Sequence, residues 1–318
     1  MARRGRLDTW LRPARYHGPV PTLGISCPLC DAEGRICFAA HGYPIRSCRA
    51  CGHRWAELES TEGHVGSVYG DAYFESGGAG YPDYLAERRL QREHGRRYAR
   101  ILEAHTTPGS MLDVGCAAGF ILRGFCDSGW SGSGVEPNAT MARFGRENLG
   151  VDIAASTFED YEDDRRYDLV TMIQVLPHFV DPRRALAAAA RLTKPGGLML
   201  VETWDRTSWT ARLMGRHWHE YSPPSVLHWF SRAGVRALAA AFGLAEIASG
   251  RPPKRLAAGH AKALIRHKFE GSRMKGLVNL PLALVPERLT LPYPLDDVFW
   301  ALFRRPAAAT GGPPRAAS

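Results

Sequence analysis

The chain has 318 residues, of which 45% are hydrophobic, and carries a formal net charge of +9 at pH 7. That length accommodates one full α/β domain plus a smaller module, and no apolar run approaches the roughly 20 residues that a membrane-spanning helix needs. The basic N-terminal segment lacks an apolar stretch, which argues against a secretory signal. The charge suits an anionic partner such as nucleic acid, a nucleotide-linked substrate or acidic lipid, but its spread along the chain makes a solvated basic surface the simpler explanation.

Composition divides the chain into five segments. We expect a loose basic leader at 1–18, a module with paired cysteines at 19–58 and a Gly- and Tyr-rich linker at 59–84. Residues 85–303 carry alternating strand and helix patterns. The end of the chain, 304–318, is mostly Ala, Gly and Pro and is expected to be disordered.

Four of the seven cysteines form two CxxC pairs with seventeen residues between them, namely Cys27, Cys30, Cys48 and Cys51. Each pair can present two thiolates from a tight turn, and two such pairs complete a tetrahedral zinc site. A site closed by four thiolates has no open position, so the zinc would be structural. A redox dithiol and four unlinked cysteines are the alternatives. Free cysteines in this pattern are typical of a reducing cytosol and predict a cytoplasmic protein.

The central region predicts a regular alternation of elements. After a helix at about 84–104 come strands at 111–114, 132–135, 151–154, 168–173, 198–202 and 244–248. The helices between them are expected at 120–128, 140–149 and 182–193, with a turn at 194–197 and a last helix capped by Ser231 and running to 242. Repeated βα units imply a parallel sheet covered by helices on both faces, which is an α/β fold.

A ligand loop follows the first of these strands. Asp113 and Gly115 are followed by Cys116, Ala117 and Gly119, and small residues let the backbone approach a ligand closely. Glu136 ends the next strand, twenty-one residues after Gly115, where a carboxylate can accept hydrogen bonds from ribose hydroxyls. This arrangement fits a dinucleotide or S-adenosylmethionine. The dinucleotide fingerprint requires glycine at positions 115, 117 and 120, and positions 117 and 120 are Ala and Phe.

The loop resembles the D-x-G-x-G-x-G loop of class I S-adenosylmethionine-dependent methyltransferases, with Ala117 in place of the middle glycine. If that position needs a positive φ, alanine costs about 1 kcal/mol there. Residues 175–182 resemble the family's VLEH-x-x-DP segment, 192–197 its L-KPGG turn, and 298–303 its antiparallel seventh strand. With the cysteine pairs, the chain resembles zinc-ribbon-bearing relatives of the ubiquinone-biosynthesis O-methyltransferases.

The resemblance implies a Rossmann-like, seven-stranded and mostly parallel sheet with helices on both faces, preceded by a small zinc ribbon. It also implies roles for particular residues in binding S-adenosylmethionine. Asp113, Gly115 and Gly119 would hold its amino-acid part within the loop that includes Cys116 and Ala117, and Glu136 would hold its ribose. Phe158 and Glu159 fall where adenine contacts lie, and Gln174 lines the methyl side. Phe158 as a core residue and Glu159 as a solvated one are the alternatives.

Histidines follow two of the strands at the edge where open sheets bind ligands. Methyl transfer is an in-line displacement in which the enzyme mainly aligns the acceptor, although a hydroxyl acceptor needs a base. His178, after the strand at 168–173, is our first choice as base or substrate contact. His219, Tyr221 and His228 follow the next strand and are expected in the substrate region. For each, a structural role is the alternative, and their spacing matches no metal motif.

We therefore expect a methyltransferase acting on a small molecule, by O-methylation of a sugar, natural-product or lipid-linked intermediate. One alternative is a ribosomal RNA base methyltransferase that uses the ribbon for docking, although the Asn/Asp-Pro-Pro-aromatic motif is missing after the strand at 168–173. The other is a catalytically silent binding protein. The intact Asp113, Gly119 and Glu136 argue against it, because a silent protein has no physical need for them.

Overall fold

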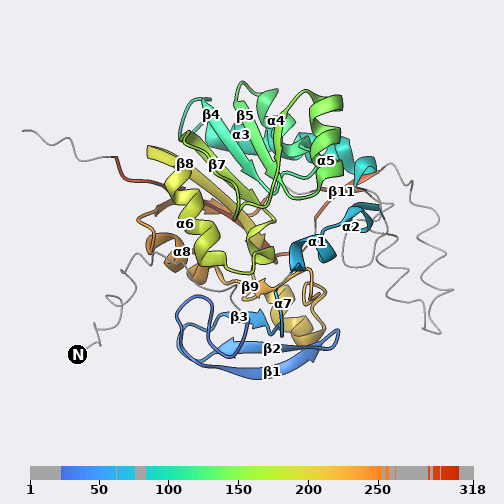
Figure 1. The fold of residues 1–318 in the computed structure, drawn as a ribbon, viewed down its shortest axis with the longest axis vertical. Helices are drawn as coiled ribbons and strands as arrows, with labels where there is room; N and C mark the ends of the chain where they lie inside the picture. The colour runs from blue at the N-terminus through green and yellow to red at the C-terminus, as the bar shows by residue number, and fades with distance from the viewer. Residues whose placement is uncertain are drawn as a thin grey trace, which may run out of the picture.

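The computed structural model describes residues 23–61, 63–75, 84–252, 255–257, 262, 286, 289–293 and 295–307. The predicted leader at 1–18 and most of the predicted tail lie outside these residues. Two main sheets organise the described chain, a seven-stranded one in the upper half of Figure 1 and a four-stranded one at its bottom. Among the described helices, none has the length and apolar character needed to cross a membrane.

The larger sheet has the strand order β10-β13-β8-β7-β4-β5-β6. Its strands are β4 (Ser110–Val114), β5 (Ser131–Glu136), β6 (Asp152–Ala155), β7 (Tyr167–Ile173), β8 (Thr193–Trp204), β10 (Ala245–Gly250) and β13 (Val298–Arg304). Strands β6, β5, β4, β7 and β8 pair in parallel, and β13 runs antiparallel between β8 and β10. The predicted seven-stranded, mostly parallel sheet is confirmed, including its antiparallel strand near the C-terminal end.

One helix precedes these strands and four lie between them, with bounds α3 (Arg88–Leu102) before β4, and α4 (Phe120–Cys126), α5 (Ala139–Phe144), α6 (Pro182–Leu192) and α8 (Arg232–Ala240) between strands. Side-chain caps at the starts of α5, α6 and α8 satisfy backbone N–H groups that have no partner inside the helix. Asn138 accepts from the Met141 amide and Ser231 from the Gly234 amide, so the predicted Ser231 cap is confirmed.

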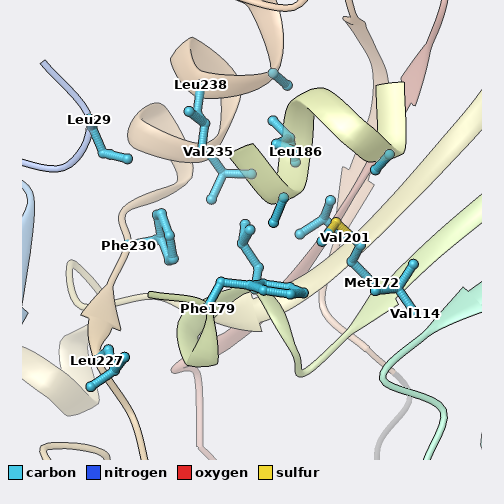
Figure 2. Close-up of a cluster of buried hydrophobic side chains, with 14 of the residues drawn as sticks. Leu29, Val114, Met172, Phe179, Leu186, Val201, Leu227, Phe230, Val235 and Leu238 are labelled. Carbon is cyan, nitrogen blue, oxygen red and sulfur yellow. The ribbon is translucent and has the colours of Figure 1, made fainter. Parts of the chain in front are cut away.

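Alternate strand residues build two hydrophobic cores on opposite faces of the sheet, as the two-residue period of a strand requires. Leu169 and Leu198 pack in the core that includes residues of α3 and α4. Their neighbours Val170 and Met199 belong to the core under α6 and α8. Figure 2 shows part of this second core, where Leu186, Val235 and Leu238 of these two helices lie over Met172 and Val201.

The four-stranded sheet combines two distant parts of the chain. Strands β1 (Gly34–Ala40), β2 (Tyr43–Cys48) and β3 (Arg54–Ala56) are followed in the sheet by β9 (His228–Trp229), which comes from the segment between β8 and α8. The Ala56 amide donates to the Leu227 carbonyl at 2.9 Å. Leu29, beside the first cysteine pair, joins the core of the larger sheet (Figure 2). The cysteine module therefore packs on the larger domain as one body with it, which the sequence did not predict.

Two local expectations differ from the structure. The segment 194–197 was expected as a turn, but it lies inside β8, where backbone hydrogen bonds join Gly196 and Gly197 to Arg305 and so extend the pairing with the C-terminal strand. The predicted linker contains two short helices, α1 (His64–Val68) and α2 (Asp71–Glu75). The predicted domain boundaries themselves stay a prediction.

The remaining short elements are α7 (Trp209–Met214), β11 (Arg255–Ala257), β12 (Thr290–Pro292) and single turns at Leu85–Glu87, Gly145–Leu149, Leu176–His178 and Gly215–His217.

Candidate functional site

A pocket opens at the C-terminal ends of β4, β5 and β7, with about 1180 Å³ of empty space that is partly open to solvent. The chain passes from β4 to β5 on one side of the sheet and later returns to β7 on the other side, so the pocket lies where the strand order reverses. Ligands of open α/β sheets bind at such points. Residues of α1, α2 and α3 complete the wall.

The loop after β4 has a backbone that few residues adopt. Gly115, Ala117 and Gly119 all have positive φ, at 67°, 49° and 78°. A Cβ atom on Gly115 would lie 2.5 Å from Cγ2 of Val175, and one on Gly119 would lie 2.9 Å from Cδ1 of Ile153. Only glycine fits these two positions. The positive φ considered for Ala117 is observed, at a cost of about 1 kcal/mol.

Two buried carboxylates border this loop. Glu136 accepts hydrogen bonds from the amides of Ala117 and Asn138, both at 2.9 Å. Asp113 accepts one from the Thr171 hydroxyl at 2.6 Å. Burial raises the pKa of each carboxyl group to about 7. A ligand that donates hydrogen bonds or carries positive charge would stabilise their ionised forms and bind tightly here.

Gln174, directly after β7, is held in a strained conformation beside the pocket. Its φ is +57°, and its Nε2 donates to Oε1 of Glu202 at 2.7 Å. Glu202 is buried and also accepts hydrogen bonds from His94 and from the Tyr98 hydroxyl. Among the described residues, the buried Oε1 of Gln174 has no hydrogen-bond partner. This atom is an acceptor available to a ligand.

The predicted cofactor residues come together at this pocket. Its lining includes Asp113, Gly115, Cys116, Ala117, Glu136, Phe158, Glu159 and Gln174. Gly119 faces away from the pocket, toward Val151 and Ile153. Phe158 is buried, and its ring also packs near Tyr161 and Phe179. Phe158 is therefore partly a core residue as well as part of the pocket lining. Burial raises the pKa of Glu159. The side chain is therefore not fully solvated, in contrast to the alternative considered from the sequence.

His178 also lines the pocket, and its surroundings fix its tautomer. Its Nδ1 lies 2.5 Å from the carbonyl oxygen of Ser225, which can only accept, so Nδ1 carries the proton. Nε2 of the neutral ring is then an acceptor. Burial lowers the pKa of His178 to about 4, so the ring is neutral at pH 7. The Tyr69 hydroxyl donates to the same carbonyl at 2.6 Å.

An aromatic wall from the predicted linker faces the glycine loop. Tyr69 of the α1–α2 segment, Tyr73 and Phe74 of α2, and Tyr84 line the pocket. Burial raises the pKa of Tyr69, which keeps its hydroxyl protonated as a donor. Sequence reasoning noted the Tyr-rich composition of this segment but did not place it at the site. The repeated aromatic residues were the available signal.

His219, Tyr221 and His228 do not belong to the described lining of the pocket. Tyr221 accepts a hydrogen bond from Arg54 at 2.6 Å, and Nδ1 of His228 lies 3.1 Å from Nε2 of His53, so both contact the ribbon. His219 lies near Glu220, with an Nε2 to Oε1 distance of 3.0 Å. A role for these three at the acceptor stays a prediction that the geometry does not favour.

The four predicted zinc ligands cluster at one end of the small sheet. The sulfur atoms of Cys27, Cys30, Cys48 and Cys51 all lie within 4.8 Å of one another. Three of the sulfur pairs are separated by 3.4–3.6 Å. Tetrahedral zinc with bonds of about 2.3 Å would place its sulfurs about 3.8 Å apart. The donor set and spacing therefore fit zinc, and the exposed Cys37 lies outside the cluster.

Comparisons with known proteins agree with this geometry. A family model described as a methyltransferase domain matches residues 86–249. Over 127 residues the chain is 35% identical to a ubiquinone biosynthesis O-methyltransferase of Rhodopseudomonas palustris (strain BisB18) and 33% identical to one of Bradyrhizobium sp. (strain ORS 278). Each match covers 38% of this chain and 48% of the relative, so the chain spans about half the length of these curated relatives.

Two solved structures also resemble this chain. A S-adenosylmethionine-dependent methyltransferase of Thermotoga maritima, described as a possible histamine N-methyltransferase, has a TM-score of 0.47 and 19% identity, over 70% of this chain and 93% of that one. The 1,6-didemethyltoxoflavin-N1-methyltransferase of Burkholderia thailandensis has a TM-score of 0.49 and 15% identity, over 86% of this chain and 100% of that one.

Proposed function

This chain belongs to the methyltransferase-domain family, and we propose that it transfers a methyl group from S-adenosylmethionine to a hydroxyl oxygen of a small molecule. The observation that carries the proposal is that His178, with its Nδ1 held by the Ser225 carbonyl, lines the same pocket as Gly115 and Glu136. His178 would be the general base. The family match supports the reaction class, and the acceptor is inferred from the pocket.

The pocket fits S-adenosylmethionine in shape and chemistry. The Gly115 loop leaves room that a Cβ atom would fill, and Glu136 retains acceptor capacity for the two ribose hydroxyls. Asp113 and the unpartnered Oε1 of Gln174 are acceptors suited to the ammonium group of the cofactor's amino-acid part. When bound, the cofactor supplies a methyl group that is already activated as a sulfonium.

His178 would prepare the acceptor for attack. Its Nε2 accepts the proton of the acceptor's hydroxyl group, and the resulting alkoxide or phenoxide character makes that oxygen the nucleophile. The Ser225 carbonyl holds Nδ1–H and thereby fixes both the ring and its tautomer. After transfer, Nε2 releases the proton to water and the neutral ring is restored.

An aromatic acceptor fits the wall opposite the loop. The rings of Tyr69 and Tyr73 meet edge to face, with centroids 5.2 Å apart, and can pack against a planar or apolar molecule. The relatives named as ubiquinone biosynthesis O-methyltransferases support an acceptor of this kind. A small molecule enters a pocket of this sort more readily than an RNA base, which must first leave its stack.

We further propose that the four cysteines hold a structural zinc ion and that the protein acts in the cytoplasm. A four-thiolate site supplies folding free energy and leaves no coordination position for a substrate. Its thiolates must stay reduced, as they do in the cytoplasm.

The function can be tested with methyl-labelled S-adenosylmethionine and a deproteinised cell extract, half of it treated with ribonuclease. Label in the small-molecule or lipid fraction, unaffected by ribonuclease and lost with His178→Gln, is the expected result. Label in RNA that ribonuclease removes would replace the proposal with an RNA methyltransferase. Absence of label together with absence of cofactor binding would indicate a silent relative.

A further inference from the structure

A second groove runs along the side of α3 and shares no described lining residue with the methyl-transfer pocket. It encloses about 1330 Å³ of empty space, partly open to solvent, between α3 and the short strands β11 and β12. Phe120 and Leu149 contribute apolar surface. Its lining carries six arginines and one glutamate, namely Arg88, Arg89, Arg92, Arg96, Arg97, Arg255 and Glu93.

Within the described part of the chain, ion pairs balance part of this charge. Asp127 accepts hydrogen bonds from Arg92 and Arg96, which fasten α3 to the end of α4. Glu93 lies 3.6 Å from Arg97. The same glutamate also pairs with Arg96 and with the more exposed Arg100. Among the described residues, the six arginines of the groove therefore outnumber Asp127 and Glu93, the two carboxylates that pair with them here.

The arginines are close enough to repel one another. Arg97 is the least exposed of those in ion pairs along α3, with 16% of its side chain accessible. Burial, together with the positive charges of Arg255 and Arg100, lowers its pKa in spite of Glu93. Bringing like charges together costs free energy that a bound anion would recover.

We propose that this groove binds a phosphate or diphosphate group. Planar guanidinium groups match phosphate oxygens with paired hydrogen bonds, and several of them on one helix face can hold a diphosphate from different sides. The group could belong to a nucleoside diphosphate or to a phospholipid, which share this chemistry. The inference goes beyond the proposed methyl transfer and does not depend on it, because binding can be measured directly.

The groove lies next to the catalytic pocket. Phe120, in the groove, stacks on Tyr84 with ring centroids 5.5 Å apart, and Tyr84 lines the pocket. This pair of rings therefore borders both cavities.

Calorimetric titration of the full chain with inorganic pyrophosphate at low salt tests the proposal. We expect a dissociation constant tighter than about 1 mM. Arg89→Glu, at an exposed position, should weaken binding at least tenfold, and Arg97→Gln should do so without reversing a charge. The matched control is Arg191→Glu, an exposed arginine in the last turn of α6 on the opposite face of the sheet.

Pyrophosphate that does not bind, or binding weakened as much by Arg191→Glu as by Arg89→Glu, would overturn the proposal. Two further titrations identify the source of the phosphate. Binding of a nucleoside diphosphate that Arg89→Glu abolishes would support a soluble ligand, and equally sensitive binding to vesicles containing phosphatidic acid would support a lipid. Tight binding of duplex RNA without pyrophosphate binding would reject a discrete phosphate site in favour of a nucleic-acid surface.

Discussion

Replacing Cys30 with serine should slow methyl transfer without weakening cofactor binding. The substitution removes one sulfur from the four-cysteine cluster, and a zinc ribbon that loses its metal loses folding free energy. The consequence for the pocket follows from β9. This strand pairs with β3 of the ribbon, and the segment preceding it holds His178 through the Ser225 carbonyl.

The magnitude follows from the contacts across this junction. Besides the pairing of β3 with β9, three hydrogen bonds join the ribbon to the segment 221–228, namely Ala56 to Leu227, Arg54 to Tyr221 and His53 to His228. At about 1 kcal/mol each, their loss removes about 3 kcal/mol of restraint. Displacement of a catalytic group by about 1 Å can cost roughly 100-fold in rate, so we expect kcat to fall by about 10- to 100-fold.

Cofactor affinity should change by less than about twofold, because Glu136 and Asp113 accept hydrogen bonds from Ala117, Asn138 and Thr171, which lie outside the ribbon. Steady-state kinetics give kcat, and calorimetry with S-adenosylhomocysteine gives the affinity. Cys37→Ser is the matched control, since Cys37 is exposed and outside the cluster. Full kcat in Cys30→Ser would refute the coupling of ribbon and base. A parallel loss of affinity would show that the ribbon supports the whole domain instead.

Three further predictions concern single residues. His178→Gln should lower kcat by about 100-fold or more at unchanged S-adenosylhomocysteine affinity. With cofactor and acceptor saturating, so that bound ligand already holds Asp113 and Glu136 ionised, the wild-type kcat should decline only as pH falls toward the pKa of His178, about 4, whereas an acid limb of kcat centred at or above pH 6.5 would contradict the burial argument. Ala117→Gly should raise Tm by about 2–4 °C, because it relieves about 1 kcal/mol of backbone strain. Gly119→Ala should lower Tm, because Gly119 has a φ of 78° and a Cβ atom there would lie 2.9 Å from Cδ1 of Ile153. A lower Tm for Ala117→Gly than for Gly119→Ala would refute the loop argument. Burial lowers the folded-state pKa of His178 to about 4 and of His228 to about 3, below the ordinary 6.5, so the unfolded state binds more protons at these residues, while the raised pKa of Asp113 and Glu136 acts in the opposite direction. Between pH 7 and pH 5 the free energy of unfolding from denaturant titration should therefore fall by about 2 kcal/mol more in the wild type than in His178→Gln or His228→Gln; equal pH dependence of wild type and variant would contradict neutral burial.

The parts of the molecule that were predictable are those encoded by neighbouring residues. The loop from Asp113 to Gly119 and the paired cysteines can be recognised in the sequence, because their chemistry requires particular residues at fixed short spacings. The strands followed from local apolar runs. The last strand, Val298–Arg304, was found only through its resemblance to a family.

The parts that were missed depend on contacts between distant segments. Because Tyr221 and His228 follow β8, they were expected to reach the ligand. The ribbon packs on this segment instead, where Arg54 hydrogen-bonds Tyr221 and His53 hydrogen-bonds His228. Residues 194–197 were expected to form a turn, but they lie in a strand because the backbone of Arg305 forms hydrogen bonds with Gly196 and Gly197. The aromatic wall of Tyr69 and Tyr73 forms only when α1 and α2 fold onto the pocket.

The affinity of the full chain for S-adenosylhomocysteine, measured by calorimetry in the wild type and in Glu136→Ala, tests the central claim most directly. We predict a micromolar dissociation constant for the wild type and a loss of at least about tenfold for the variant, because the variant lacks the acceptor for the ribose hydroxyls. A wild-type protein that does not bind, or a variant that binds equally well, would contradict the assignment of this pocket to the methyl donor.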